Sequence, residues 1–191
     1  MRPGTLDLLD AHFTKKLFDD YDSLGINPRF SSSEEKFIID PRYWEKYYLE
    51  LEQHTFDWQE IKYDTKPDVG QLINSSLPGV YMFYIKPSKS IFDLPRFILY
   101  VGISGETNSL RPLKERLADY FRVKQIKKRD ALERLIGKYY HHTYIAYSLM
   151  DLDMSGLKSL ESNLIGFYYP LANKDDFPVE IENPRKAFNR R

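Results

Sequence analysis

Two short apolar runs near the middle of the chain constrain its fold more than any other feature. They cover residues 78–85 and 97–102, are rich in β-branched and aromatic residues, and are bounded by proline or glycine. The connection between them contains the stretch Lys86-Pro87-Ser88-Lys89-Ser90. Two strand-forming runs joined through such a stretch predict an antiparallel β-hairpin.

The segments around this hairpin mostly have the periodicity of helices. Apolar residues recur at helical spacing in five segments, 5–22, 41–51, 112–123, 131–139 and 156–168. Asp40 followed by Pro41 is a start signal for the second segment, and Ser155 can cap the last. Residues 141–149, rich in Thr, Tyr and Ile, predict a third strand. We therefore expect an α+β fold, a small antiparallel sheet of about three strands flanked by helices, with an N-terminal helical extension.

Length and charge divide the chain into three parts. At 191 residues it is long enough for one domain with a decorated end and too short for two domains of ordinary size. Residues 1–75 hold 9 Lys and Arg against 15 Asp and Glu, whereas the remaining residues hold 19 against 13. We therefore expect an acidic helical extension over 1–75, a core domain over 76–175 and an extended basic C-terminal tail over 176–191.

The composition excludes several classes of chemistry. The chain has no cysteine, which excludes disulfides, thiolate nucleophiles and Cys-ligated metals and leaves ligand types that favour a hard cation. No run approaches the ~18 apolar residues that a membrane span requires. Residues 1–5 lead into acidic sequence rather than into an apolar signal core. We expect a cytoplasmic protein without a membrane partner.

Each run of the hairpin carries a tyrosine beside a glycine, as Gly79-Val80-Tyr81 and Tyr100-Val101-Gly102. This pattern resembles the signature of the GIY-YIG nuclease superfamily, and the resemblance covers roughly residues 77–175. Arg116 matches the helix arginine of the family, with a tyrosine four residues later. Glu161, in the middle of a predicted helix, and an asparagine twelve residues later continue the match. The resemblance implies six catalytic residues: Tyr81, Tyr100, Arg116, Tyr120, Glu161 and Asn173.

These residue types suit the hydrolysis of a phosphodiester, which needs an activated water and cations that neutralise the charge on phosphorus. Arg116 would neutralise a non-bridging oxygen, and Glu161 would hold a Mg²⁺ or Mn²⁺ ion. Tyr81 or Tyr120 would take a proton from the water. Because the pKa of a free tyrosine is ~10, that role requires a nearby cation that lowers the pKa. We expect Asn173 to order the closing loop or the tyrosine network rather than to react.

Each of these residues also has a purely structural interpretation. Strand tyrosines beside glycines are more often core residues with satisfied hydroxyls. Arg116 could form a surface ion pair with Glu161, Glu115 or Asp119. Arg111 is a rival for the catalytic arginine, but it has no aromatic or histidine partner four residues later.

One position departs from the family pattern. Ile103 follows Tyr-Val-Gly, where the family often carries lysine or another polar residue, so Lys114 or Lys86 would have to substitute for that lysine. His141 and His142 are neighbours on a predicted strand and face opposite sides, which makes them poor joint metal ligands.

Residues 122–138 hold seven basic residues against two acidic ones, a pattern typical of contacts with backbone phosphates. The nucleic-acid-binding residues that we expect are Arg111, Lys114, Arg122, Lys124, Lys127, Lys128 and Arg129. The predicted function is that of a divalent-metal-dependent DNA endonuclease, either restriction- or defence-like or repair-like.

Two alternative functions remain open at the level of sequence. One is a non-catalytic nucleic-acid-binding module. The other is an interaction subunit of a larger defence or repair complex, which would dock through its aromatic N-terminal helices. For residues 1–75 themselves we expect one of three roles: bracing the sheet, covering the basic face, or binding a second copy or a protein partner.

Overall fold

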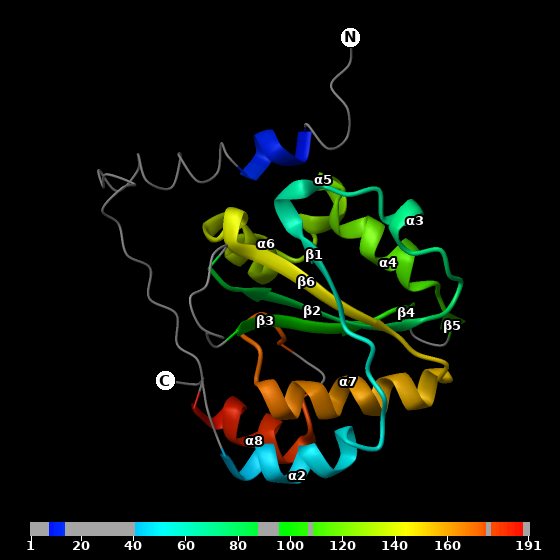
Figure 1. The fold of residues 1–191 in the computed structure, drawn as a ribbon. Helices are drawn as coiled ribbons and strands as arrows, with labels where there is room; N and C mark the ends of the chain where they lie inside the picture. The colour runs from blue at the N-terminus through cyan, green and yellow to red at the C-terminus, as the bar shows by residue number, and fades with distance from the viewer. Residues whose placement is uncertain (1–7, 14–40, 88–95, 107–108, 175–176, 189–191) are drawn as a thin grey trace.

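A four-stranded antiparallel sheet lies at the centre of the computed structural model, which describes residues 8–13, 41–87, 96–106, 109–174 and 177–188 (Figure 1). The strand order is β1-β6-β2-β3. The strands are β1 (Gln59–Lys62), β2 (Gly79–Ile85), β3 (Phe97–Ile103) and β6 (Thr143–Leu149), and a separate two-stranded ribbon contains β4 (Gly105–Glu106) and β5 (Ser109–Leu110). The expected α+β class and the hairpin of β2 and β3 are confirmed.

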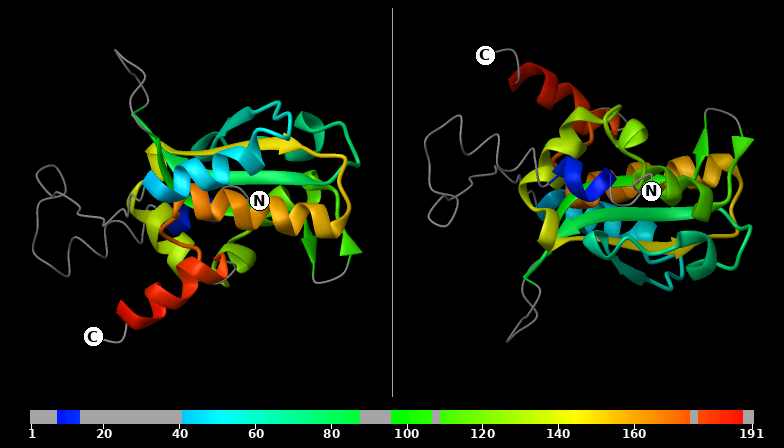
Figure 2. Two further views of the ribbon diagram at one scale, coloured as in Figure 1. Left: turned by 90° about the horizontal axis from the view of Figure 1, so that it is seen from below. Right: turned by 90° about the horizontal axis from the view of Figure 1, so that it is seen from above.

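Helices cover both faces of this sheet, as Figures 1 and 2 show. One face carries residues 8–13, η1 (Tyr63–Thr65), α3 (Val69–Leu72), α4 (Leu113–Tyr120), α5 (Val123–Ile126), α6 (Asp130–Lys138) and η2 (Tyr140–His142). The other carries α2 (Pro41–Leu51), α7 (Met154–Tyr168) and α8 (Val179–Phe188). Successive strand residues point to opposite faces, so Tyr81 belongs to the first core, whereas Val80 and Met82 belong to the second.

A β-bulge in β3 places two successive residues, Leu99 and Tyr100, on the same face of the sheet. Phe83 pairs with Tyr100, but the next residue of β2, Tyr84, pairs with Ile98, which leaves Leu99 as an extra residue. A bulge of this kind breaks the strict alternation of faces. As a result Leu99 and Tyr100 both pack on the core beneath α4 and α6.

The N-terminal part of the chain packs on both faces of the sheet. Leu9 and Phe13 are fully buried in the core of the α4 face. On the other face α2 packs along α7, and the ring of Tyr47 lies so close to Gly166 that a Cβ there would meet its Cε2 atom at 2.4 Å. The rest of the helix expected over 5–22 lies outside the described residues.

The strand count was underestimated, because β1 comes from the segment that the sequence assigned to the helical extension. It pairs antiparallel with β6 over its four residues, from Gln59 opposite Tyr147 to Lys62 opposite Tyr144. Only Ile61 of these four is buried, so the strand carries little of the apolar alternation by which strands are recognised.

The prediction of an extended C-terminal tail was wrong, because residues 179–188 form α8. Ile181 is buried against the core of the α7 face, and the Glu180 carboxylate accepts hydrogen bonds from Lys46 and Tyr47 of α2. Pro184 lacks the N–H that would bond the carbonyl of residue 180. The hydroxyl of Tyr43 donates to that carbonyl instead, at 3.4 Å.

Two helix boundaries also differ from expectation. The helix predicted over 112–123 ends at Tyr120 and is followed by the separate short helix α5. The helix predicted over 156–168 is α7, and it is capped by Asp153 and not by Ser155. The Asp153 carboxylate accepts from the N–H of Gly156 at 2.7 Å. Over the part of the chain described above, no helix is both long enough and apolar enough to cross a membrane.

Candidate functional site

Three of the signature side chains meet in one hydrogen-bonded group under α4. The hydroxyls of Tyr81 and Tyr120 are 2.7 Å apart, and Nε of Arg116 donates to the Tyr81 hydroxyl at 3.1 Å. The ring centroid of Tyr100 lies 6.2 Å from that of Tyr81. We call these four residues, Tyr81, Tyr100, Arg116 and Tyr120, the tyrosine cluster. Arg116 and Tyr120 share one face of α4, as their four-residue spacing predicts.

The absence of a side chain at Gly102 leaves space for the rings of Tyr81 and Tyr100. A Cβ at this position would lie 2.6 Å from the hydroxyl oxygen of Tyr81, and 2.9 Å from a ring carbon of Tyr100. Gly79 has a comparable constraint, since its Cβ would lie 2.3 Å from the carbonyl oxygen of Ser148 in β6. Both signature glycines are therefore required by close packing, one against a phenol and one against a neighbouring strand.

Burial decides the protonation of two phenols in this cluster. It raises the pKa of Tyr120 well above its ordinary value, with Tyr81 and Tyr100 adding to the effect and Arg116 and Arg129 opposing it. Burial likewise raises the pKa of Tyr100. Both phenols therefore stay protonated at neutral pH. The suggestion that Tyr120 takes a proton from water does not fit these surroundings.

Arg116 is the cation of the cluster. Although burial lowers its pKa, the adjacent phenols of Tyr81 and Tyr120 raise the pKa above the ordinary arginine value, so the guanidinium stays charged. Its hydrogen bond goes to Tyr81. The rival, Arg111, instead donates to Asp119 at 2.7 Å and to the carbonyl of Glu115 at 3.1 Å. The structure therefore places Arg116, and not Arg111, against the signature tyrosines.

Glu161 approaches the same cluster from the opposite layer of the molecule. It lies in the middle of α7 and is half-buried. After burial and the influence of Tyr81, its negative charge is a further cause of the raised pKa of Tyr100, whereas the charge of Arg116 lowers that pKa. The pKa of Tyr100, on the edge strand β3, is thus affected by two opposite charges, one on each side of the sheet.

Asn173 fixes the edge strand and not the phenols. Its Oδ1 accepts from the N–H of Val101 and its Nδ2 donates to the carbonyl of Val101, both at 2.9 Å. The N–H of Ala172 donates to the carbonyl of Leu99 at 2.7 Å. This segment takes the place of a further strand beside β3. Asn173 therefore orders the segment that closes against β3, which is one of the roles that the sequence favoured for it.

A large basic hollow opens next to the tyrosine cluster, with a volume of about 740 Å³. Its lining residues come from α4, α5 and the turns beside them, up to the start of α6: Arg111, Arg116, Asp119, Arg122, Gln125, Lys128 and Arg129. We call this hollow the basic pocket. Its member Arg116 also contacts Tyr81, so the pocket and the cluster share one guanidinium.

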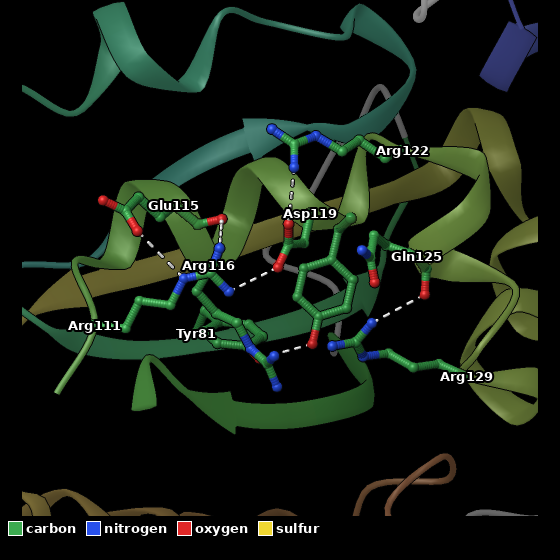
Figure 3. Close-up of polar contacts among 9 residues, drawn as sticks. Tyr81, Arg111, Glu115, Arg116, Asp119, Arg122, Gln125 and Arg129 are labelled. Atoms are coloured by element: carbon green, nitrogen blue, oxygen red, sulfur yellow. Dashed lines mark hydrogen bonds and ion pairs between the residues drawn. The ribbon is translucent and has the colours of Figure 1, made fainter. Parts of the chain in front are cut away.

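Asp119 organises one wall of the basic pocket (Figure 3). Its side chain is almost fully buried, and its two oxygens accept from different arginines, Arg111 at 2.7 Å and Arg122 at 3.3 Å. On the opposite wall, the guanidinium carbon of Arg129 lies 4.6 Å from the ring centre of Tyr120. A cation at this distance interacts favourably with the face of the ring.

Four of the seven residues predicted to bind nucleic acid line this pocket, namely Arg111, Arg122, Lys128 and Arg129. Lys114 lines a neighbouring hollow of about 370 Å³. Lys124 and Lys127 are exposed outside both hollows. The position of Arg129 over Tyr120 was missed, because the turn between α5 and α6 brings Arg129 back to the end of α4.

The departure at position 103 has a structural reason. Ile103 is buried in the core of the α7 face, where a lysine would lack solvent. Neither proposed substitute reaches the cluster: Lys86 pairs with Glu60 at 2.7 Å, and Lys114 lines the neighbouring hollow. Arg129 is instead the second cation beside the phenols.

His141 and His142 lie in η2 and not on the strand that the sequence predicted. Nδ1 of His141 lies 3.1 Å from the Asp64 carboxylate. Within the described ranges, no group of three or more histidine, aspartate or glutamate side chains is placed to hold a metal ion.

Comparison of the chain with protein-family models, with curated proteins and with solved structures gave no match.

Proposed function

We propose that the chain is a DNA endonuclease of the cytoplasm that hydrolyses phosphodiester bonds with the help of a divalent metal ion. One observation carries this proposal: Arg116 donates a hydrogen bond to Tyr81 and also lines the basic pocket. A phosphate in the pocket can therefore contact this guanidinium. The same guanidinium lies beside a phenol that can contact the attacking water.

The chain's own residues supply most of the groups that the reaction needs. Arg116 binds a non-bridging oxygen of the phosphate and balances the charge that develops on it. The hydroxyl oxygen of Tyr81 accepts from Nε of Arg116 and shares a hydrogen bond with the Tyr120 hydroxyl, in which either oxygen can be the donor. Tyr81 is fully buried behind Arg116. Water therefore reaches its hydroxyl only when the phosphate draws the guanidinium toward the pocket.

Glu161 is the carboxylate that would hold the metal. The described residues provide no cage of three or more ligand side chains. A Mg²⁺ or Mn²⁺ ion bound by one carboxylate, with substrate phosphate and waters as its other ligands, fits this arrangement. When bound, such an ion supplies Lewis-acid stabilisation of the phosphate oxygens.

Nicking of supercoiled plasmid tests the proposal. Wild-type protein is incubated with plasmid and Mg²⁺, then with Mn²⁺, beside Glu161→Ala and Arg116→Ala. Arg42→Ala, which removes an exposed cation of α2 on the other face of the sheet, is the matched control. We expect cleavage by wild type and the control and none by the other two. Equal cleavage by Glu161→Ala would show that the site is misplaced.

A second candidate function is a nucleic-acid-binding module without catalysis. The complete burial of Tyr81 and Tyr120 favours it, because buried phenols serve a core as well as a reaction. This candidate predicts that DNA binds with the same affinity in EDTA and in Mg²⁺ and that no preparation nicks plasmid. Whether an active enzyme serves restriction, defence or repair depends on which DNA it cuts.

A further inference from the structure

The basic pocket carries more charge than the hydrolysis of one phosphate uses. Five cationic side chains line it against the single carboxylate of Asp119, and the proposed reaction assigns a role to Arg116 alone. The volume of about 740 Å³ falls within the range of ~300–1,000 Å³ typical of pockets that enclose a whole small ligand. Charge and size therefore both point to a ligand with several negative groups.

The lining of the pocket restricts the kind of ligand. All seven lining residues are polar or charged, and Gln125 is the one uncharged member. Tyr120 lies beneath Arg129 and is fully buried. Bases bind single-strand-specific proteins by stacking on exposed aromatic rings. Because this lining offers no such ring, it suits phosphates and not bases.

Asp119 orients two of the cations in advance. It binds Arg111 and Arg122 through separate oxygens, and the Arg122 side chain, which is 58% exposed, has further N–H donors for a ligand, since arginine has five. An incoming phosphate therefore meets donors that are already directed, which reduces the entropy lost on binding.

We propose that the basic pocket holds two or more consecutive phosphates of one nucleic-acid strand, on one side of the phosphate that Arg116 contacts, without reading the bases. The assignment of the scissile phosphate to Arg116 rests on the proposed function, whereas binding of linked phosphates by the pocket does not. The strand therefore lies across α4, α5 and the turn before α6 on that side of the cut.

Inorganic tripolyphosphate is a probe that offers linked phosphates without bases. Its binding to the full chain is measured by titration calorimetry in EDTA. The pocket variant is Arg122→Gln combined with Lys128→Gln, and the control variant is Arg42→Gln combined with Lys158→Gln, which makes the same charge change at exposed positions on the other face of the sheet. We expect the pocket variant to bind at least tenfold more weakly and the control within twofold of wild type. Equal losses in both variants, or no binding by wild type, overturn the proposal.

DNA binding at several salt concentrations gives the second measurement. Each phosphate contact on a single strand contributes about 0.7 to the slope of log affinity against log salt. The pocket variant should therefore lower the slope by about 1.4 for an oligo(dT) and for a mixed sequence alike, and the control variant by less. A loss confined to one sequence would show base readout instead. Tighter binding of tripolyphosphate than of the oligonucleotide would assign the pocket to inorganic polyphosphate and overturn the nucleic-acid proposal.

These outcomes separate the pocket from the nuclease. If plasmid is not nicked but the pocket variant loses both tripolyphosphate and DNA, the proposed function fails and the pocket proposal stands. If plasmid is nicked and the pocket variant binds like the control, the reverse holds. Thermal unfolding checks each variant, and Lys128→Gln alone, at an exposed position, carries the test if the Arg122 substitution prevents folding.

Discussion

Replacement of Gly102 by alanine tests the packing on which the tyrosine cluster depends. The new Cβ would lie 2.6 Å from the hydroxyl oxygen of Tyr81, 2.7 Å from its Cζ and 2.9 Å from a ring carbon of Tyr100. Tyr81 cannot turn away easily, because it is fully buried and bonded to Arg116 and Tyr120. Overpacking of a filled core costs about 1–3 kcal/mol. In a chain of this size, that cost lowers the unfolding temperature by roughly 2–12 °C.

Thermal unfolding followed by circular dichroism measures this cost. Gly70→Ala is the control, because its Cβ would meet only the end of the Asp68 side chain, at 3.2 Å, on an exposed helix. We expect the control to change stability by less than about 1 kcal/mol. A Gly102→Ala protein that unfolds at the wild-type temperature would refute the packing described here.

A double-mutant cycle locates the clash. Tyr81→Phe removes the atom closest to the new Cβ, so Gly102→Ala should cost less in the Tyr81→Phe background than in wild type. A coupling of about 1 kcal/mol is expected for residues in direct contact. Additive costs would place the strain elsewhere in β3. In the nicking assay, Gly102→Ala should lose activity even below its unfolding temperature, because displacement of Tyr81 breaks its contact with Arg116.

Three further predictions follow from contacts elsewhere in the fold. Asn173→Ala leaves the buried N–H and carbonyl of Val101 without partners and should cost about 2–4 kcal/mol in a denaturant titration, whereas Asn74→Ala, at an exposed position, should be neutral. Tyr120→Phe should lower plasmid nicking by the same factor at about pH 6 and about pH 9, because burial keeps the pKa of Tyr120 well above both; a factor that changes with pH would identify it as a titrating base. Burial raises the pKa of Asp64, but hydrogen bonds from His141 and Lys62 more than offset this and lower it overall, so its stabilisation is present above the unfolded pKa of ~3.9 and is lost as pH falls through the folded value. Asp64→Asn should therefore make the unfolding temperature less sensitive to pH between about 5 and about 3, and an unchanged acid sensitivity would contradict that assignment.

The strands and helices that the sequence located correctly are those with strong local signals. β2 and β3 are continuous apolar runs, and α2 begins at Pro41 as its start signal predicts. β1 was missed because it has one buried residue, Ile61, and is held by pairing with β6. α8 was missed because Pro184 opposes a helix locally, and the bonds of Glu180 to α2 are tertiary.

The candidate site shows the same division between local and tertiary information. The four-residue spacing of Arg116 and Tyr120 predicts a shared helix face, and both do meet Tyr81. No spacing rule places Arg129 over the Tyr120 ring. Likewise, the bulge that places Leu99 on the same face as Tyr100 depends on the pairing register and not on composition. The charge of Glu161 affects the pKa of Tyr100 because α7 packs against the edge strand β3.

The hydrogen bonds of Ala172 and Asn173 to β3 also affect how copies of this protein can meet. A sheet edge with free N–H and carbonyl groups is a template for pairing with a strand of another chain, and soluble proteins block such edges to avoid aggregation. Here the outward groups of Leu99 and Val101 are already bonded within the chain. Strand-to-strand assembly through the middle of β3 is therefore closed, and a dimer would have to form through other surfaces, of which the exposed Trp44 and Tyr48 on α2 are examples.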